Sequence, residues 1–585
     1  MNQQMWLVAD QNVQHRIINA MIKEHIYTED TQLSESDELV IFNKNNYKLN
    51  IEKVRTTALM RYQFNGFPQF VVGERVEEVA SVERLLEIIE HYFDIPVSQR
   101  LTEELVSSRN GFVLTYKHFE NRKALIKSSL QFTKMPESLN FFAWLQYLND
   151  NNQLDELNYS ESLILEGHPT HPLSKTKLPL TDEEVKRYAP EFEKIIPLKI
   201  MLIHHTHCVT TSMEQNDQYI LDYIIPEYKG KLEAFLAPYQ LKLEDYRVMI
   251  VHPWQYDNVI VQQFSEWIKE SKLLPTPFEI ESKATLSFRT MALLHKPYHI
   301  KLPVNVQATS AVRTVSTVTT VDGPKLSYEL QDMLNIYPQL QVSMEPYGIH
   351  AMTDLNTARQ LGVIVRQQPK IDHDGITLVT ASLVNRNPVD GKVIVDSYLD
   401  WVGEGVTTKA IKRFIKAYAE TLIKPLLAYI QDFGIALEAH MQNTIVSLGE
   451  GFQMKFNVRD LGGSRIDLTT FNHRVPHVEL TNKSLIAEDI VAVIAKFQHA
   501  VIQNQIAELI HHFTQYEGVA ERELFDIVRE VTQDSIDNNK PHATQINNVL
   551  FGRKITVKSL LRMRMESKVK QYVTIDLDNP LYREV

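Results

Sequence analysis

The sequence has a single cysteine, Cys208, among 585 residues. One cysteine excludes an intramolecular disulfide and a cysteine-rich metal site, and it is typical of a reducing compartment. No uninterrupted apolar run is long enough to span a bilayer, and the first residues lack the basic and apolar regions of a secretory signal. We therefore expect a cytoplasmic protein with no membrane partner.

Positive charge is also scarce. The formal net charge is −12, with 61 Lys and Arg residues against 73 Asp and Glu residues. General binding to nucleic acid needs a basic surface, so this class of partner is excluded. A hydrophobic content of 44% is that of an ordinary globular protein. Small molecules are the expected partners.

The chain is too long for one ordinary core, and at roughly 100 to 200 residues per domain it predicts two to four units. Internal repeats, low-complexity tracts and long flexible linkers are lacking. We place soft boundaries near residues 158 and 375, which gives units of residues 1–158, 159–375 and 376–585.

The residues from Ile435 to Gly463 are predicted to form a hairpin. Ile435 to Leu448 is the expected first strand, and Phe452 to Arg459 is the expected return strand. A helix that Thr407 and Thr408 can cap, and that Gly434 stops, leads into it. Because side chains alternate along a strand, one face of the first strand carries polar groups: Glu438, His440 and Gln442.

Asn443 has the wrong parity to share that face, so we expect a twist or bulge that turns it toward Asp460. Carboxylate, imidazole and amide groups in nearly consecutive positions have weak strand propensity and could bind phosphate, metal or substrate. The alternative is a half-exposed hairpin whose polar face meets water.

A second polar region lies between Thr285 and Ser316. Ser287 and Arg289 would share one side of an extended segment, and Lys301 begins an alternating strand. A hydroxyl, a guanidinium and an ammonium on adjacent strands would form a cradle for a polyphosphate. A straight strand would place Lys301 about 26 Å from Thr309, at roughly 3.3 Å per residue. Either the chain bends or the two residues serve two ends of a long site; the alternative is a solvated surface strand.

Histidines form two further clusters. His168 and His171 each precede a proline, which favours a stiff extended loop, and with Lys175 and Lys177 they could bind an anion; the alternative is a rigid surface turn. The tract from His204 to Cys208 would offer at best two convergent metal ligands as a strand. We interpret it as a partly buried strand with hydrogen-bonded histidines.

Taken together, these motifs resemble the aerobactin-synthetase (IucA/IucC) family of siderophore synthetases, which work independently of nonribosomal peptide synthetases. The resemblance runs from about residue 160 to the end of the chain. Its motifs occur in the family's order: GHPTHPLSK at 167–175, HPWQ at 252–255, SFRT at 287–290, KLPVNVQATSAVRT at 301–314, EAHMQN at 438–443, RDLGG at 459–463 and NPL near the end.

The resemblance implies a mixed α/β (α+β) fold shaped as a cupped hand with antiparallel sheets. Residues 1–158 would be the thumb, residues 159–375 the fingers with the phosphate-binding residues, and residues 376–585 the palm with the metal and acid-binding residues. ATP and a carboxylic acid would lie between fingers and palm. Family members are often homodimers, so a homodimer is expected.

The implied reaction is formation of an acyl-adenylate from ATP and a carboxylic acid, followed by capture of the acyl group by an amine. Within the family, the chain most resembles the branch that makes staphyloferrin B from 2-oxoglutarate; activation of citrate or a citryl amide is the alternative. The resemblance assigns His440, Arg313 and Lys301 to catalysis. It assigns ATP to His168, His171, Lys175, Ser287, Arg289, Lys301, Asn443 and Asp460, the acid to Thr309, Arg313, His440 and Gln442, and Mg²⁺ to Glu438, Asn443 and Asp460.

Two rival functions remain open. A kinase-like phosphotransferase would also use a strand lysine (Lys301), a His440 and Asn443 loop and a later aspartate (Asp460), but no glycine-rich phosphate loop precedes Lys301. A noncatalytic siderophore or iron carrier would instead use the tract from His204 to Cys208. Release of ADP without pyrophosphate would favour the kinase, and binding without ATP or turnover would favour the carrier.

Overall fold

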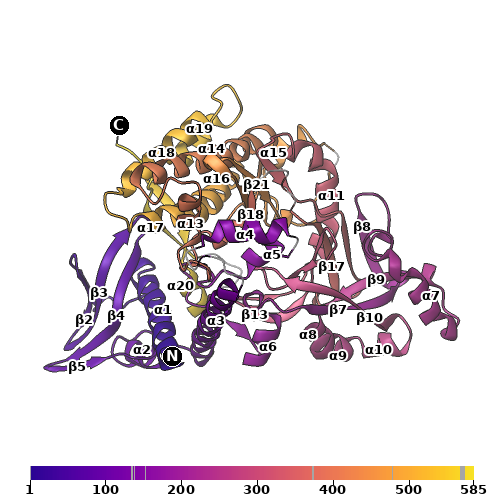
Figure 1. Ribbon diagram of the computed structural model, residues 1–585, viewed down its shortest axis with the longest axis horizontal. Coiled ribbons are helices and arrows are strands. Elements are labelled where there is room, and N and C mark those ends of the chain that lie inside the picture. Colours follow the sequence, from indigo (N-terminus) through magenta and orange to yellow (C-terminus); the bar gives the residue numbers. More distant parts are fainter. Residues whose placement is uncertain are drawn as a thin grey trace.

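The computed structural model describes residues 2–132, 136, 139–151, 153–369, 371, 375–476, 478–566 and 573–584. It has three lobes, as Figure 1 shows. Helices mix with sheets whose strand pairs are antiparallel, except for one parallel pair among the described residues. The predicted mixed α/β class with antiparallel sheets is confirmed.

The N-terminal lobe pairs three helices with a five-stranded sheet of order β1-β2-β3-β4-β5. Apolar side chains of the helices and of one sheet face form its core. Its elements are α1 (Asn2–Lys23), β1 (Gln32–Glu35), β2 (Leu39–Lys44), β3 (Tyr47–Thr57), β4 (Arg61–Val72), β5 (Arg75–Glu78), α2 (Val82–His91) and α3 (Gln99–Phe132).

The second lobe is built on an eight-stranded antiparallel sheet of order β8-β16-β17-β12-β11-β10-β7-β9. A small sheet, β14-β13-β6, lies beside it. The strands are β6 (Lys177–Leu178), β7 (Ile196–His204), β8 (Cys208–Ser212), β9 (Tyr246–Val251), β10 (Leu273–Ala284), β11 (Thr290–Leu293), β12 (Tyr298–Lys301), β13 (Val304–Ala308), β14 (Ala311–Arg313), β16 (Tyr347–Ala351) and β17 (Gly362–Gln367).

The third lobe surrounds helix α14 (Thr408–Phe433). Of the two predicted caps, Thr407 caps this helix by accepting from the backbone N–H of Ala410, and Thr408 is its first residue. As predicted, Gly434 ends the helix, with φ +64°. The helix packs on a sheet of order β15-β21-β20-β18. Its strands are β15 (Leu340–Val342), β18 (Ile376–Val379), β20 (Thr444–Leu448) and β21 (Met454–Val458).

The predicted strand from Ile435 to Leu448 is wrong. Two short strands replace it, β19 (Ile435–Ala436) and β20, with an irregular loop at residues 437–443. β19 pairs with β22 (Arg465–Ile466) in a different sheet, so the chain must bend before it joins β21. Backbone hydrogen bonds from His440 N–H to the Glu438 carbonyl and from Asn443 N–H to the His440 carbonyl hold the bend.

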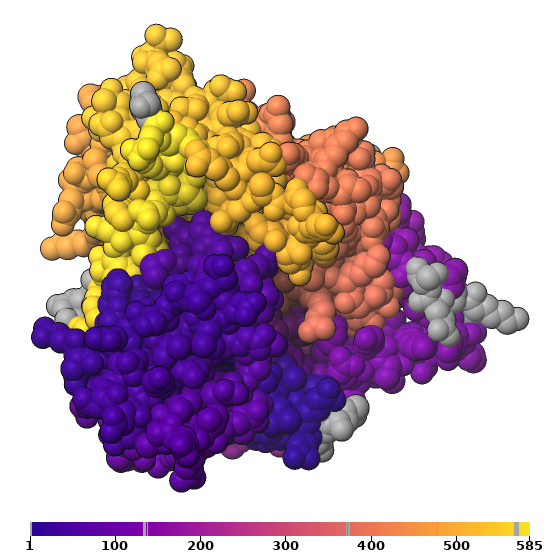
Figure 2. Space-filling view, turned by 90° about the vertical axis from the view of Figure 1, so that its left-hand side faces the viewer, coloured from indigo at the N-terminus to yellow at the C-terminus, as the bar shows by residue number. Residues whose placement is uncertain are grey.

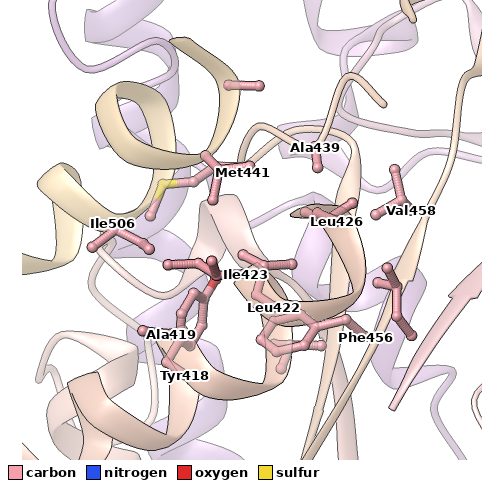
Figure 3. Close-up of a cluster of buried hydrophobic side chains, with 14 of the residues drawn as sticks. Tyr418, Ala419, Leu422, Ile423, Leu426, Ala439, Met441, Phe456, Val458 and Ile506 are labelled. Atoms are coloured by element: carbon pink, nitrogen blue, oxygen red, sulfur yellow. The ribbon is translucent and has the colours of Figure 1, made fainter. Parts of the chain in front are cut away.

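The expected alternation of side chains survives in this loop although the strand does not. Figure 3 shows why: Ala439 and Met441 enter the core formed by α14, β21 and Ile506. Because Ala439 and Met441 are buried, the side chains next to them in the sequence, Glu438, His440 and Gln442, face outward into the cleft. The return strand is confirmed, and Arg459 N–H donates to the Asn443 carbonyl at 2.9 Å, as the predicted return toward this region requires.

The predicted strand that begins at Lys301 is also wrong. Lys301 is the last residue of β12, and β13 belongs to another sheet. Pro303 has no N–H to continue a ladder, so the chain bends between the two sheets. Ser287 and Arg289 lie in the turn between β10 and β11, where Phe288 has φ +66°, and not in an extended segment.

The predicted boundaries near residues 158 and 375 stay predictions. The hydrophobic cores cross them, because Phe141, Phe142 and Tyr159 pack in the same core as α14. Helix α11 (Thr317–Leu334) contributes Leu326, Leu330 and Leu334 to that core as well.

Candidate active site

Two adjoining cavities lie between the lobes. The first, called the polar pocket here, has a volume of about 370 Å³, and the second, the long pocket, about 390 Å³. They share the side chains of Ser287, Arg313, Glu438, His440 and Gln442. The polar pocket is also lined by Arg289, Thr290, Lys301, Thr314, Val315, Ser316, Thr319, Asn443, Asp460, Gly462 and Gly463.

A buried charge network joins the two walls of the polar pocket. Lys301 Nζ, at the end of β12, lies 2.9 Å from both carboxylate oxygens of Asp460, which follows β21. Arg366 on β17 lies 3.3 Å from Asp460 and 2.8 Å from Glu345. Despite burial, Lys301 and Arg366 hold the pKa of the Asp460 carboxyl far below its ordinary value.

The backbone of Asp460 has φ +76°, a conformation that costs a non-glycine residue energy and often marks functional sites. Its neighbour Gly463 is needed for space. A Cβ built there would lie 1.7 Å from Glu438 Oε2, so only glycine lets the Glu438 carboxylate reach this wall. Asn443, which was predicted to turn toward Asp460, lines the same polar pocket as Asp460.

Arg289 and Arg313 make the opposite wall cationic. Burial, followed by repulsion from Arg313, lowers the pKa of Arg289 to about 10, which still leaves it protonated at neutral pH. Arg289 donates to the Thr314 carbonyl. The backbone N–H of Thr290 donates to Ser287 Oγ at 3.1 Å and so fixes the turn that carries both residues. An anion between the two guanidinium groups would relieve their repulsion.

Arg313 keeps part of its guanidinium available. Its Nη2 donates to the Ala308 carbonyl and to Thr309 Oγ1, each at 2.8 Å, whereas its buried Nε has no hydrogen-bond partner among the described residues. Thr309 sits at the β13–β14 turn with φ +57°. A planar guanidinium with an open edge suits a carboxylate.

On the facing wall, Glu438 binds Lys496 Nζ at 2.5 Å, and His440 Nε2 lies 4.0 Å from the same carboxylate. Burial lowers the pKa of His440, although Glu438 opposes the shift. The imidazole is therefore neutral at neutral pH and can accept a proton. Lys496, on α16 (Ile490–Phe497), was not predicted.

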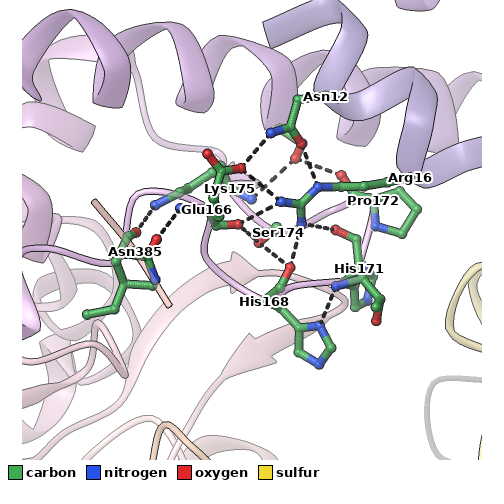
Figure 4. Close-up of polar contacts among 12 residues, drawn as sticks. Asn12, Arg16, Glu166, His168, His171, Pro172, Ser174, Lys175 and Asn385 are labelled. Carbon is green, nitrogen blue, oxygen red and sulfur yellow. Dashed lines mark hydrogen bonds and ion pairs between the residues drawn. The ribbon is translucent and has the colours of Figure 1, made fainter. Parts of the chain in front are cut away.

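The loop that carries His168 and His171 is held rigidly, as Figure 4 shows. Arg16 of α1 donates to the carbonyls of His168 at 2.5 Å, His171 at 3.3 Å and Glu166 at 3.0 Å. Asn385 Oδ1 accepts from the Glu166 N–H at 3.0 Å. Residues far apart in the sequence thus clamp one loop.

His171 lies behind the pocket walls. Its Nδ1 accepts from the Leu173 N–H at 3.1 Å, so the proton of the neutral ring is on Nε2, which is buried without a partner among the described residues. Burial, then nearby arginines, lowers its pKa to about 3. Lys175 is already engaged, with its Nζ 2.6 Å from Glu191 Oε1 and 2.7 Å from the Ile164 carbonyl.

The cleft therefore gathers the predicted site residues, with His171 as the exception among those described: the others line one or both pockets. His168, Lys175 and Thr309 line only the long pocket. The sequence placed Glu345 and Arg366, the latter at the end of the apolar run GVIVR at 362–366, in predicted strands near the cleft but gave them no role. Lys496 was missed, and nothing local in the sequence marks it.

The donor chemistry of Glu438, Asn443 and Asp460 suits a hard cation such as Mg²⁺. In the structure, however, each carboxylate has a cationic partner, Lys496 or Lys301. Within the described residues, no group of three His, Cys, Asp or Glu side chains is placed to hold a metal, and this includes the tract from His204 to Cys208. That tract ends β7 and turns into β8, with His204 Nδ1 hydrogen-bonded to Thr206 Oγ1.

Two family models match the chain. Residues 156–385 match the IucA / IucC family, and residues 412–573 match a model described as ferric iron reductase FhuF-like transporter. No helix in the described ranges is long and apolar enough to cross a membrane.

Among curated relatives, staphyloferrin A synthase of Staphylococcus aureus is 58% identical over 99% of this chain and 99% of its own length. D-ornithine–citrate ligase of the same species is 29% identical over 74% of this chain and 71% of its own. Staphyloferrin B synthase, also from that species, is only 24% identical over 64% of this chain and 66% of its own length. The predicted place beside the staphyloferrin B branch is therefore wrong.

Solved structures share the fold. The petrobactin biosynthesis protein AsbB of Bacillus anthracis has a TM-score of 0.82 at 19% identity, over 99% of this chain and 96% of that one. ATP-bound aerobactin synthetase IucA of Klebsiella pneumoniae has a TM-score of 0.80 at 19% identity, over 98% and 100%.

Proposed function

The chain belongs to the IucA/IucC family of siderophore synthetases and is an ATP-dependent ligase, and from this premise we propose its reaction. A carboxylate of citrate attacks the α-phosphate of ATP, which gives citryl-adenylate and pyrophosphate. An amine of a citryl–amino acid precursor then captures the acyl group and releases AMP. The product is a citrate-containing siderophore.

One observation carries this proposal: the polar pocket sets cations against oxygen donors in one cavity. Ser287, Arg289 and Lys301 lie on one side, and Glu438, Asn443 and Asp460 on the other. Adenylation needs charge stabilisation and alignment of two anions more than it needs a protein nucleophile. The described arrangement supplies both, which supports the ligase and not the noncatalytic carrier.

The relatives support citrate over 2-oxoglutarate as the acid. Identity to staphyloferrin A synthase is 58%, against 24% to staphyloferrin B synthase. The name of a further relative, D-ornithine–citrate ligase, pairs citrate with an amino acid. Citrate is also the better match for a pocket rich in cationic donors, because it carries three carboxylates and each can take a charge-assisted hydrogen bond.

Each residue then has a task. Arg313 and Thr309 hold and orient the attacking carboxylate, while Ser287, Arg289 and Lys301 hold the phosphates. When Mg²⁺ is bound, Glu438, Asn443 and Asp460 would hold it, and it would neutralise phosphate charge. The neutral imidazole of His440 faces the junction of the two pockets and can take the proton that the attacking amine loses.

A panel of acids tests the proposal. Citrate, 2-oxoglutarate and succinate are each supplied with ATP and Mg²⁺, and pyrophosphate release is measured. We expect citrate to exceed 2-oxoglutarate by at least about tenfold in kcat/KM, which corresponds to about 1.4 kcal/mol of transition-state binding. Equal or faster turnover of 2-oxoglutarate would refute citrate as the acid. ADP without pyrophosphate would refute adenylation and favour the kinase-like reaction.

A further inference from the structure

The long pocket reaches beyond the reaction residues to the N-terminal lobe. There it is lined by the end of α1 and by the turn between β3 and β4. The opposite side comes from α17 (Ala507–Phe513), from Glu521 at the start of α18 (Glu521–Asp534) and from the segment around Val557. Figure 2 shows the N-terminal lobe against this C-terminal part of the chain. A substrate in the long pocket would therefore touch both ends of the sequence.

The carboxylates at this end of the long pocket already have donors. Glu24 accepts from the backbone N–H groups of Leu561 at 3.3 Å and Arg562 at 2.8 Å. Glu508 forms an ion pair with Arg61. Glu521 accepts from the backbone N–H of Ala58 at 2.9 Å. None of these acids depends on a ligand for its hydrogen bonds.

Lys23, the last residue of α1, has no such hydrogen-bond partner among the described residues. It is half-buried and lines the long pocket, but among the described residues no hydrogen-bond or ion-pair partner contacts its ammonium. Burial lowers its pKa to about 8, with Glu24 and Glu508 opposing the shift and Arg61 adding to it. It is therefore mainly protonated at neutral pH. A partly desolvated cation without a partner is costly, and an anionic ligand group would offset that cost.

We propose that Lys23 binds a carboxylate of the amine substrate and so selects acidic amines, those built on an amino acid, over plain diamines and polyamines. This inference rests on the proposed function. With its carboxylate at Lys23, such a substrate lies along the long pocket and presents its amine at the junction, where Glu438, His440 and Gln442 line both pockets.

The same residue supplies discrimination against the wrong amine. A plain diamine would place a second ammonium near Lys23 and Arg61, where the carboxylates already have donors, and would leave Lys23 without an anion in hydrogen-bonding contact. Repulsion of a competitor adds to attraction of the correct substrate, so one side chain serves both purposes.

The test compares matched amines in the Lys23→Met variant, which keeps an unbranched side chain of similar length but removes its charge. D-ornithine and citryl-D-ornithine carry the amino-acid carboxylate, and 1,4-diaminobutane is ornithine without it. We expect the wild type to prefer a carboxylated amine. In the variant, the KM for that amine should rise at least about tenfold, because one charge-assisted contact is lost. Turnover of 1,4-diaminobutane should not fall.

Citrate-dependent exchange of pyrophosphate into ATP, measured without amine, separates this inference from the proposed function. If the wild type shows no such exchange, adenylation of citrate is refuted. If exchange is intact and the variant matches the wild type on the carboxylated amine, the role of Lys23 is refuted, as it is if the wild type prefers 1,4-diaminobutane. Lys48→Met, at an exposed lysine of the same lobe, is the matched control, and Lys23→Arg should restore the low KM.

Discussion

At the scale of single residues, the two cations Lys301 and Arg313 face the cleft with different partners. The Lys301 ammonium is neutralised by Asp460 at 2.9 Å, whereas the acceptors of Arg313 among the described residues, Ala308 and Thr309, are neutral. Loss of Lys301 would leave the Asp460 carboxylate turned toward the phosphates. Loss of Arg313 would remove the planar guanidinium whose free edge can bind a carboxylate through two hydrogen bonds.

We therefore expect the two alanine variants to separate the ligands. Lys301→Ala should raise the Kd for ATP by about 10- to 100-fold, from the roughly 1.5–3 kcal/mol of a hydrogen bond to a charged group. Arg313→Ala should abolish citrate-dependent pyrophosphate release and leave the Kd for ATP within about twofold, as read by calorimetry. Arg313→Lys, which keeps the charge without the fork, is the control. If both variants lost ATP affinity and citrate-dependent pyrophosphate release to the same extent, ATP and citrate would not be bound at separate ends of the site.

At the scale of elements, helix α1 acts on the cleft through a loop. Arg16 donates hydrogen bonds to the carbonyls of Glu166, His168 and His171. Its guanidinium carbon also lies 5.0 Å from the centroid of the Phe112 ring, and this cation–π contact helps to fix the guanidinium. The loop cannot hold this shape alone, because a buried carbonyl without a donor costs about 1–3 kcal/mol. The N-terminal lobe thus supports the site even though its own sequence carries no catalytic motif.

Replacement of Arg16 by Met should loosen the loop without removing a ligand contact. We expect the KM for ATP to rise about tenfold, and thermal unfolding to occur at a lower temperature because a charged donor worth roughly 1.5–3 kcal/mol is lost. Arg75→Met, at an exposed arginine of β5, is the control. An Arg16→Met enzyme that is less stable but keeps the wild-type KM would limit Arg16 to a purely structural role.

The loop of residues 437–443 shows how much of the site the sequence predicts. Alternation placed Glu438, His440 and Gln442 on one side, and they do face the cleft, because the intervening Ala439 and Met441 are buried. The strand itself was wrong, since the bend depends on pairing with β22, which lies downstream. Pairings across many residues, such as Lys496 with Glu438, leave no local pattern and appear only in the fold.

At the scale of the whole molecule, the site exists only where the lobes meet. Ser287, Arg289 and Lys301 come from the second lobe, and the loop at 437–443 with Asp460 comes from the third. The resemblance predicted the fold class and a cleft in which residues of the second lobe face residues of the third. It did not predict the core that crosses the expected boundaries, because packing of Phe141 and Tyr159 against the third lobe is a tertiary contact without a sequence signature.

If a citrate carboxylate attacks the α-phosphate of ATP, one oxygen of that carboxylate must end in AMP. The most direct measurement uses citrate labelled with ¹⁸O in its carboxylates, with ATP, Mg²⁺ and citryl-D-ornithine, and reads the label by mass spectrometry. We expect AMP that carries one ¹⁸O and pyrophosphate that carries none. Label in inorganic phosphate, with ADP as the nucleotide product, would contradict it.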